Sequence, residues 1–124
     1  MPGFVVHEHW ASHHHLDFRL EMDGVLKSWA VPKGVPVAPG IKHLAVQVDD
    51  HSLDYGSFEG TIPEGHYGAG KVEIWDRGEY TLDERTPSLI RFTLQGTKLR
   101  GEYALVLMSG GKGQWLILKR GPAN

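Results

Sequence analysis

The spacing of glycine and proline is the feature that most limits what this chain can fold into. Its 124 residues include sixteen glycines and seven prolines, spread along the chain rather than massed in one tract. The segments between them carry no apolar pattern with a helical period of any length. This spacing predicts short strands joined by tight turns, and therefore an all-β fold.

Segments that alternate apolar and polar residues, or that form short apolar runs, mark the expected strands. They cover residues 4–10, 15–22, 25–31, 43–49, 70–75, 79–82, 89–94, 102–108 and 114–119. The expected turns are Asp23-Gly24, which is a strong hairpin signal, Asp76-Arg77-Gly78, Gln95-Gly96 and residues 109–113. About eight mostly antiparallel strands in so short a chain favour a small closed or nearly closed barrel, because closure hides sheet edges. A two-sheet sandwich is the second choice.

Length and composition indicate one domain over residues 1–124. A hydrophobic fraction of 40% suffices for a single modest core, and no repeat or low-complexity linker divides the chain. No apolar run approaches the roughly 20 residues that span a bilayer, and the start of the chain does not resemble a signal peptide. We therefore expect a cytoplasmic monomer with no membrane association.

Charge and cysteine content exclude several classes of site. A net charge of -2 excludes the wide basic footprint of a protein that coats duplex DNA, but leaves room for a site that binds one phosphate. The chain has no cysteine, so disulfides, zinc-thiolate sites and thiol nucleophiles are excluded. Any metal must be held by imidazole and carboxylate groups.

The stretch HEHWASHHHLDFRLE, residues 7–21, holds five of the eight histidines. Strand alternation places His7 and His9 on one face of the first strand, and His15, Asp17 and Arg19 on one face of the second. The other face of the second strand is apolar, with Leu16, Phe18, Leu20 and Met22. One face of this predicted hairpin is therefore equipped for chemistry and the other for packing.

Two histidines and one carboxylate form a common set of ligands for manganese, iron or zinc. His9 on the first strand can approach His15 and Asp17 on the second, which leaves open positions for substrate. Arg19 would lie roughly 7 Å from Asp17 along the strand, a distance that suits a guanidinium that binds an oxygen of a metal-bound phosphate. The alternatives are an exposed polar strand or a shortened tag for the histidines, and a simple ion pair for Arg19. The ordered period of two favours a site.

Further along the chain, several polar residues carry weaker signals. His51 and Tyr55, in the turn-like segment 49–55, can donate to a phosphoryl oxygen, although a solvated turn also explains them. Lys33 follows a rigid Val-Pro turn and can reach an anion, but most such lysines only face solvent. His66 and Tyr67, inside the glycine-rich loop 63–70, carry a similarly weak signal.

The four tryptophans are most simply residues that pack in the core or at strand edges. They are Trp10, Trp29, Trp75 and Trp115. Trp10, beside His9, could alternatively stack on a base.

Three segments together resemble a known family. FVVHEHWASHHHLDFRLEMDGVLKSWAVPKG, LAVQVDDHSLDY and FEGTIPEGHYGAGKVEIWDRG resemble the 3'-phosphoesterase domain of bacterial DNA ligase D and its stand-alone archaeal relatives. The resemblance covers nearly the whole chain, with long motifs in fixed order over about seventy residues. It implies a small β-barrel hydrolase with a divalent metal, typically Mn²⁺, with Zn²⁺ or Co²⁺ as alternatives.

The implied substrate is a DNA primer-template 3' end that carries a ribonucleotide or a 3'-phosphate. In this family a phosphodiesterase step removes the terminal ribonucleoside, and a phosphomonoesterase step then removes the phosphate to leave a 3'-OH. The implied partners are the DNA ligase, polymerase and Ku of non-homologous end joining.

The resemblance also implies roles for individual residues. The metal ligands would be His9, His15 and Asp17, and the catalytic residues Arg19, Lys33, His51 and Tyr55. Three further substrate-binding positions depart from the family pattern: His7 replaces a glutamine, Asp49 the commoner glutamate, and His43 an arginine. The change at His43 predicts weaker monoesterase activity. The chain begins almost at the first motif, so we expect an N-terminal arm that carries active-site residues in the bacterial enzymes to be absent or removed.

Two other functions compete with this one. The first is a non-haem iron oxygenase on a double-stranded β-helix, which also uses a His-x-Asp pair with a distant histidine. It needs a third ligand late in the barrel, whereas no histidine follows His66. The second is a non-catalytic module that binds nucleic-acid ends, which would not need a complete ligand set.

Overall fold

Antiparallel strands dominate the computed structural model, which describes residues 1–121. The elements are β1 (Gly3–Trp10), β2 (His14–Met22), β3 (Val25–Val31), β4 (Lys42–His51), a 3-10 helix η1 (Leu53–Ser57), β5 (Gly60–Ile62), β6 (Gly70–Thr86), β7 (Leu89–Gly96), β8 (Arg100–Leu107) and β9 (Gln114–Lys119). Within this range, no helix is long and apolar enough to cross a membrane. The predicted single domain also includes residues 122–124, which lie outside the described residues.

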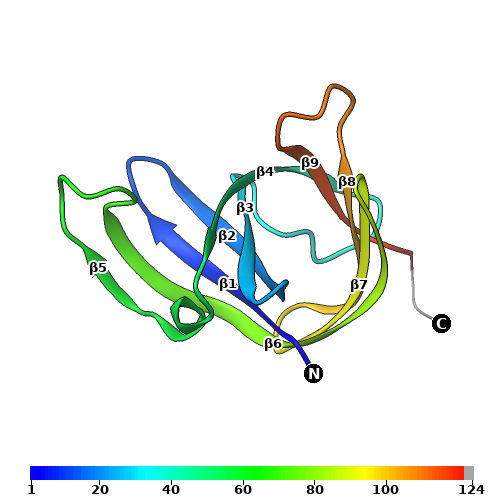
Figure 1. Cartoon of the computed structure of the whole chain (residues 1–124), viewed down its shortest axis with the longest axis horizontal. Coiled ribbons are helices and arrows are strands. Elements are labelled where there is room, and N and C mark those ends of the chain that lie inside the picture. The colour runs from blue at the N-terminus through cyan, green and yellow to red at the C-terminus, as the bar shows by residue number, and fades with distance from the viewer. Residues whose placement is uncertain (122–124) are drawn as a thin grey trace.

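The strands close into a barrel (Figure 1). Eight of them are hydrogen-bonded in the order β1-β2-β3-β4-β9-β8-β7-β6, and pairing of β1 with β6 closes the ring. The short β5 lies outside the barrel and pairs with the start of β6. The predicted all-β barrel of about eight mostly antiparallel strands is therefore confirmed.

Two predicted turns are wrong, and the first lies inside a strand. Asp76-Arg77-Gly78 does not separate two strands but lies inside the seventeen-residue strand β6. A Cβ atom at Gly78 would lie 2.1 Å from the carbonyl oxygen of Gln95 on β7. Glycine therefore permits a close approach of two backbones here, which is its other common role in a sheet.

Asp76 is buried and holds the β7–β8 connection. Its carboxylate accepts hydrogen bonds from the backbone N–H groups of Thr97, Lys98 and Leu99, at 2.9, 3.0 and 2.8 Å. β7 continues through Gly96, so the connection lies at residues 97–99 rather than at the predicted Gln95-Gly96. Asp76, which suggested a turn within β6, thus stabilises the turn between β7 and β8 instead.

Replacing Asp76 with alanine should therefore destabilise the barrel by about 2–4 kcal/mol, because buried N–H groups lose their acceptor. Urea unfolding measures this directly. Asp83→Ala is the matched control, since Asp83 is an exposed carboxylate of the same strand that accepts one hydrogen bond, from Thr93. Equal losses of unfolding free energy in the two variants would contradict the assignment.

The apolar side of β1 and β2 fills the barrel, together with aromatic residues from the other strands. Phe18, Leu20 and Trp29 are at most 1% exposed and belong to a core that also includes Phe92 and Tyr103. Among the other tryptophans, Trp115 is buried and Trp75 packs against the core. Trp10 is the last residue of β1, 37% exposed and stacked on the ring of His14.

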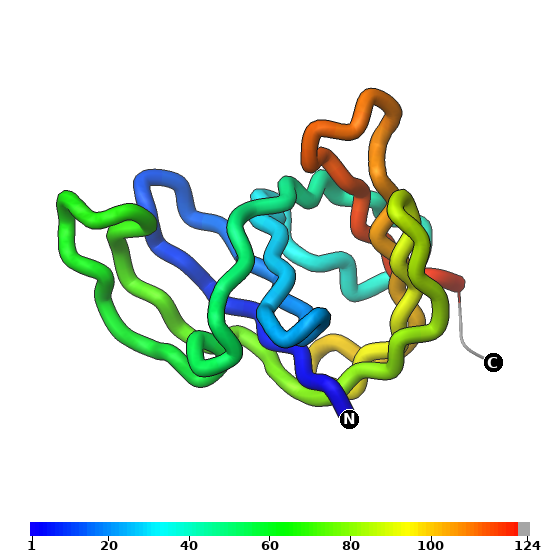
Figure 2. Tube along the Cα trace, viewed as in Figure 1, coloured from blue at the N-terminus to red at the C-terminus, as the bar shows by residue number. Residues whose placement is uncertain are grey.

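The opposite side of β1 and β2 faces away from the barrel interior, yet it is also buried. The segment from the end of β4 to the start of β6, residues 51–70, covers it. A ring nitrogen of His7 lies 3.1 Å from the carbonyl oxygen of Phe58, and one of His9 lies 2.9 Å from that of Gly68. Figure 2 shows this segment and the tip of the β1–β2 hairpin at the end of the molecule away from β7, β8 and β9. The polar groups are enclosed between the barrel wall and this covering segment.

Candidate metal and phosphate site

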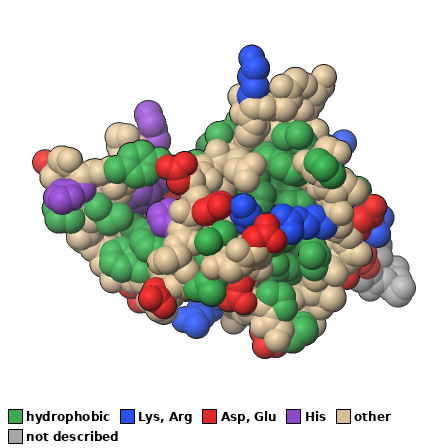
Figure 3. Space-filling model, viewed as in Figure 1, with side chains coloured by type: hydrophobic (Ala, Val, Ile, Leu, Met, Phe, Trp, Pro, Cys, Tyr) green, Lys and Arg blue, Asp and Glu red, His purple; other side chains and the backbone are tan. Residues whose placement is uncertain are grey.

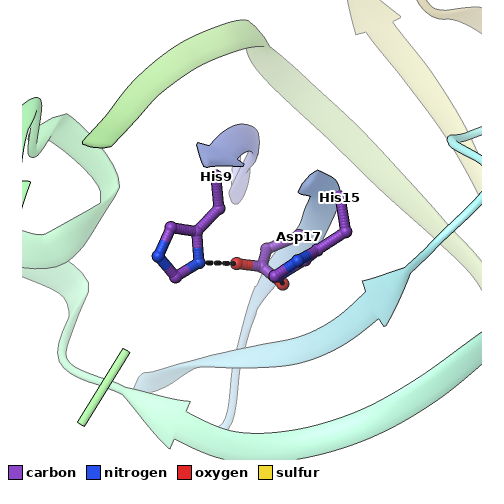
Figure 4. A group of neighbouring side chains, drawn as sticks. All are labelled: His9, His15 and Asp17. Carbon is purple, nitrogen blue, oxygen red and sulfur yellow. Dashed lines mark ion pairs between the residues drawn. The ribbon is translucent and has the colours of Figure 1, made fainter. Parts of the chain in front are cut away.

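The β1–β2 register assembles a group of three possible metal ligands. His9 pairs with His15 and His7 with Asp17, so their side chains share one face of the hairpin. His9 Nδ1 lies 3.6 Å from Asp17 Oδ2, and His15 Nε2 lies 3.0 Å from Asp17 Oδ1 (Figure 4). The three ligand atoms all lie within 4.8 Å of one another. This group could hold a metal ion.

Backbone carbonyls orient both imidazole rings toward Asp17. His9 Nε2 donates to the carbonyl oxygen of Gly68 at 2.9 Å, and His15 Nδ1 donates to that of His13 at 2.9 Å. The ring nitrogens that face Asp17 are therefore His9 Nδ1 and His15 Nε2. A histidine metal ligand commonly donates its other N–H to a carbonyl or carboxylate, which fixes its tautomer. The chemistry and orientation of the donors fit a divalent cation.

The charges of the group support one another. A hydrogen bond with Asp17 raises the pKa of His15 against the opposing effect of burial. Burial alone would raise the pKa of Asp17, but the hydrogen bond from His15 and the charge of Arg19 outweigh it and lower that pKa. Asp17 therefore stays ionised in a site where its side chain is 8% exposed. A buried carboxylate held in this way attracts cations.

Arg19 is a buried cation held on three sides. Its Nε donates to His7 Nδ1 at 3.0 Å, its Nη1 to Ser28 Oγ at 2.9 Å, and its Nη2 to Asp17 Oδ2 at 3.3 Å. The guanidinium carbon lies 4.9 Å from the centre of the Tyr55 ring. A guanidinium has five N–H donors, so two have no acceptor among the described residues. Because Arg19 also lines the cavity described below, these two donors can bind an anion.

His7 supports Arg19 from behind. It has no exposed surface, and its Nε2 donates to the carbonyl oxygen of Phe58 while its Nδ1 accepts from Arg19. Burial and the charge of Arg19 lower the pKa of His7 to about 4, so the ring is neutral at neutral pH. Both ring nitrogens are occupied by contacts within the protein, and His7 does not line the cavity described below. Its predicted contact with substrate stays a prediction.

A cavity of about 310 Å³ lies in front of these groups, and Figure 3 shows histidine side chains gathered at this end of the molecule. Its lining includes all three candidate ligands and Arg19, and also Asp49, His51 and Tyr55. The rings of His51 and Tyr55 are stacked with centres 4.3 Å apart, and Phe58 continues the stack. The structure therefore brings the second predicted group to the first.

Burial shifts the pKa values of His51 and Tyr55 so that the neutral form of each is favoured. It lowers the pKa of His51, with a further contribution from the charge of Arg19. It raises the pKa of Tyr55, although Arg19 opposes this. Tyr55 therefore keeps its phenolic proton at neutral pH, while His51 is neutral and has one N–H to donate.

Two further predicted residues lie outside the cavity, as His7 does. Lys33 is exposed in the turn after β3, where it lines a neighbouring hollow of about 250 Å³ together with His15 and Gly34. His43, on β4, donates from Nδ1 to the carbonyl oxygen of Gly34 at 2.6 Å. These two residues adjoin the site through Gly34 but do not face the cavity.

The sequence reasoning missed Ser28. This serine is fully buried, accepts from Arg19 and donates to the carbonyl oxygen of Leu26 at 3.0 Å. A usable signal was present, because the two-residue turn Asp23-Gly24 fixes the β2–β3 register and places Ser28 opposite Arg19.

Comparisons with known proteins identify the family of this chain. Residues 7–107 match the family model described as the DNA ligase D 3'-phosphoesterase domain. The multifunctional non-homologous end joining protein LigD of Pseudomonas aeruginosa is 52% identical over 123 residues, covering 94% of this chain. The corresponding proteins of Mycobacterium tuberculosis and Mycolicibacterium smegmatis are 49% and 44% identical over 118 residues, covering 91% and 86% of it. The chain spans only 15–16% of the length of these relatives. It belongs to the DNA ligase D 3'-phosphoesterase domain family.

Proposed function

We propose that this chain is a metal-dependent phosphoesterase that heals DNA 3' ends. It would remove a 3'-terminal ribonucleoside, then the remaining 3'-phosphate, and leave a 3'-OH. The observation that carries the proposal is a single cavity lined by the His9-His15-Asp17 group and by Arg19 with two available donors. The relatives' description as multifunctional end joining proteins supports a primer-template end as substrate, and the ligase, polymerase and Ku of end joining as partners.

The residues present suit a divalent transition metal. His9, His15 and Asp17 would hold it through two imidazoles and one carboxylate, a set that suits Mn²⁺, Zn²⁺ or Co²⁺ better than the all-oxygen sites of Mg²⁺. We propose Mn²⁺ as the working ion. When bound, such an ion supplies positive charge at a phosphate oxygen.

In the first step, water attacks phosphorus and the bond to the 5'-oxygen of the terminal ribonucleoside breaks. The two available N–H groups of Arg19 would bind the phosphoryl oxygens as their charge increases. His51, whose neutral ring carries one N–H, would donate a hydrogen bond to the departing oxygen, with Tyr55 as a second donor in the cavity. The proton that this oxygen gains would come from the attacking water. The nucleoside leaves with a 5'-OH, and the phosphate stays on the primer.

In the second step, water attacks the 3'-phosphate, the bond to the primer 3'-oxygen breaks, and inorganic phosphate leaves. This substrate carries more charge than the diester. Lys33, in the adjoining hollow, would contribute a cation near it, and Asp49 would contact substrate from the cavity wall. With a histidine at position 43 instead of an arginine, we expect the second step to be the slower one.

The proposal is tested with primer-templates that end in one ribonucleotide or in a 3'-phosphate. Each is incubated with the protein and Mn²⁺, Zn²⁺, Co²⁺ or Mg²⁺, or with a chelator, and the primer products are separated by size and charge. We expect release that requires added metal and is highest with Mn²⁺. Retention of primer without cleavage would favour the end-binding module instead, and oxygen consumption with an oxoacid would favour the oxygenase.

A further inference from the structure

The loop between β5 and β6, residues 63–69, lies against the metal group. Two successive turns shape it, with backbone hydrogen bonds from His66 to Pro63 and from Ala69 to His66, at 3.3 and 3.2 Å. Gly68 has a φ of +74°, which glycine adopts without strain, and its carbonyl oxygen accepts from His9. The contact with a candidate metal ligand fixes this part of the loop at the edge of the cavity.

Tyr67 stands next to that anchor and is unusual among the tyrosines. It is 87% exposed, more than any other large apolar or aromatic side chain in residues 1–121, and it lines the cavity. By contrast, Tyr80 and Tyr103 are at most 1% exposed, and each donates its hydroxyl to a backbone carbonyl. The Tyr67 hydroxyl has no hydrogen-bond partner among the described residues. Packing therefore does not explain an aromatic ring at this position.

We infer that Tyr67 is the platform on which the base of the 3'-terminal nucleoside stacks. The inference rests on the proposed function, in which that nucleoside is attached to the reacting phosphorus through its 5'-oxygen. Its base must then lie within one nucleotide of Arg19 and the metal group, at the cavity edge. Tyr67 and Ile62 supply aromatic and apolar surface there. Stacking on an aromatic ring tolerates any base, as an end-healing enzyme requires.

Trp10 is the other exposed aromatic residue near the metal group, but it lies on the wrong face. It follows His9 directly on β1, so its side chain points to the opposite side of the strand. Its ring is stacked on His14 and has the ammonium of Lys71 5.3 Å from its centre. Trp10 does not line the cavity, which makes it a matched control.

The test compares Tyr67→Ala, Tyr67→Phe and Trp10→Ala on two primers, one ending in a ribonucleoside and one in a 3'-phosphate. Only the first has a terminal nucleoside beyond the reacting phosphorus. Y67A should weaken binding of the ribonucleoside primer about tenfold relative to the 3'-phosphate primer, in both Kd and KM. This is the change expected for the loss of one base stack. Y67F should restore the preference, and W10A should not shift it. A primer that ends in a ribose without a base should bind the wild type and Y67A with similar Kd.

An equal loss on both primers in Y67A would show a general effect on the loop and overturn the inference. So would a shift in W10A, or a Y67F variant as impaired as Y67A. The ratio of the Kd values for the two primers is measured by fluorescence anisotropy in the presence of chelator. It therefore tests the stacking contact even if no primer is cleaved. A wild type that shows the Kd preference but cleaves neither primer would refute the proposed activity and leave the stacking inference standing.

Discussion

His15→Ala should reduce manganese-dependent release of a 3'-ribonucleoside by more than about a hundredfold, since even a partner outside the metal's own ligands is worth about 10- to 100-fold. The substitution removes Nε2, one of the three atoms that could hold the ion. The His15 side chain is 20% exposed near the start of β2, so its loss opens the site to solvent rather than leaving a void in the core. It also leaves the buried pair of Arg19 and Asp17 intact. Single-turnover cleavage and Mn²⁺ binding followed by electron paramagnetic resonance would measure both effects.

The neighbouring His14→Ala is the matched control. His14 is exposed, pairs with Glu8 at 2.8 Å and is not part of the metal group, so its loss should leave metal binding and cleavage within about twofold, as for most surface changes. Asp17→Asn is a poorer test, because it leaves the charge of Arg19 buried beside a neutral partner, and losing one member of a buried pair typically costs about 3–5 kcal/mol of stability. Normal turnover in His15→Ala, with unchanged thermal stability, would refute the metal assignment.

The sequence predicts this site well where the information is local. Strand alternation depends only on the geometry of one strand, and it places His9, His15 and Asp17 correctly on the chemically equipped face. The hairpin turn is also local: Asp23 and Gly24 both adopt positive φ, 58° and 78°, as a two-residue turn of this kind requires. Strand parity and turn chemistry together determine which side chains can meet across β1, β2 and β3.

The enclosure of the site depends on contacts that no local pattern reports. His7 meets Phe58 and His9 meets Gly68 across 51 and 59 residues of chain. The polar face of β1 and β2, whose sequence is also that of an exposed strand, is therefore covered by residues 51–70. His7 on this face is buried and carries no charge, and it accepts a hydrogen bond from Arg19. Gly78 shows a second limit, because the same residue permits either a turn or a close approach of two backbones. Only the position of β7 distinguishes these roles.

Arg19→Lys should lower kcat for release of the ribonucleoside by about 10²- to 10³-fold, the usual effect of losing one preorganised donor to a developing negative charge. Arg19 donates simultaneously to His7, Ser28 and Asp17 and still has two N–H groups for a phosphate. A lysine ammonium has three donors at a single point and cannot reproduce this fork. The substitution should also reduce the free energy of unfolding by about 1–3 kcal/mol, because buried acceptors lose their donor. Rapid-quench kinetics and urea unfolding measure the two effects separately.

Two further variants distinguish displacement of the Arg19 guanidinium from a general loss of protein stability. Arg85→Lys changes an exposed arginine that pairs with Asp23 far from the cavity, so its turnover should stay at the wild-type value. Ser28→Ala keeps the guanidinium but removes one of its three supports, and its kcat should fall between those of the wild type and Arg19→Lys. If the pattern reflected stability alone, kcat in the folded fraction would be equal in all three variants. An ordered decrease from Arg85→Lys through Ser28→Ala to Arg19→Lys is expected only if catalysis depends on where the two available N–H groups of Arg19 point.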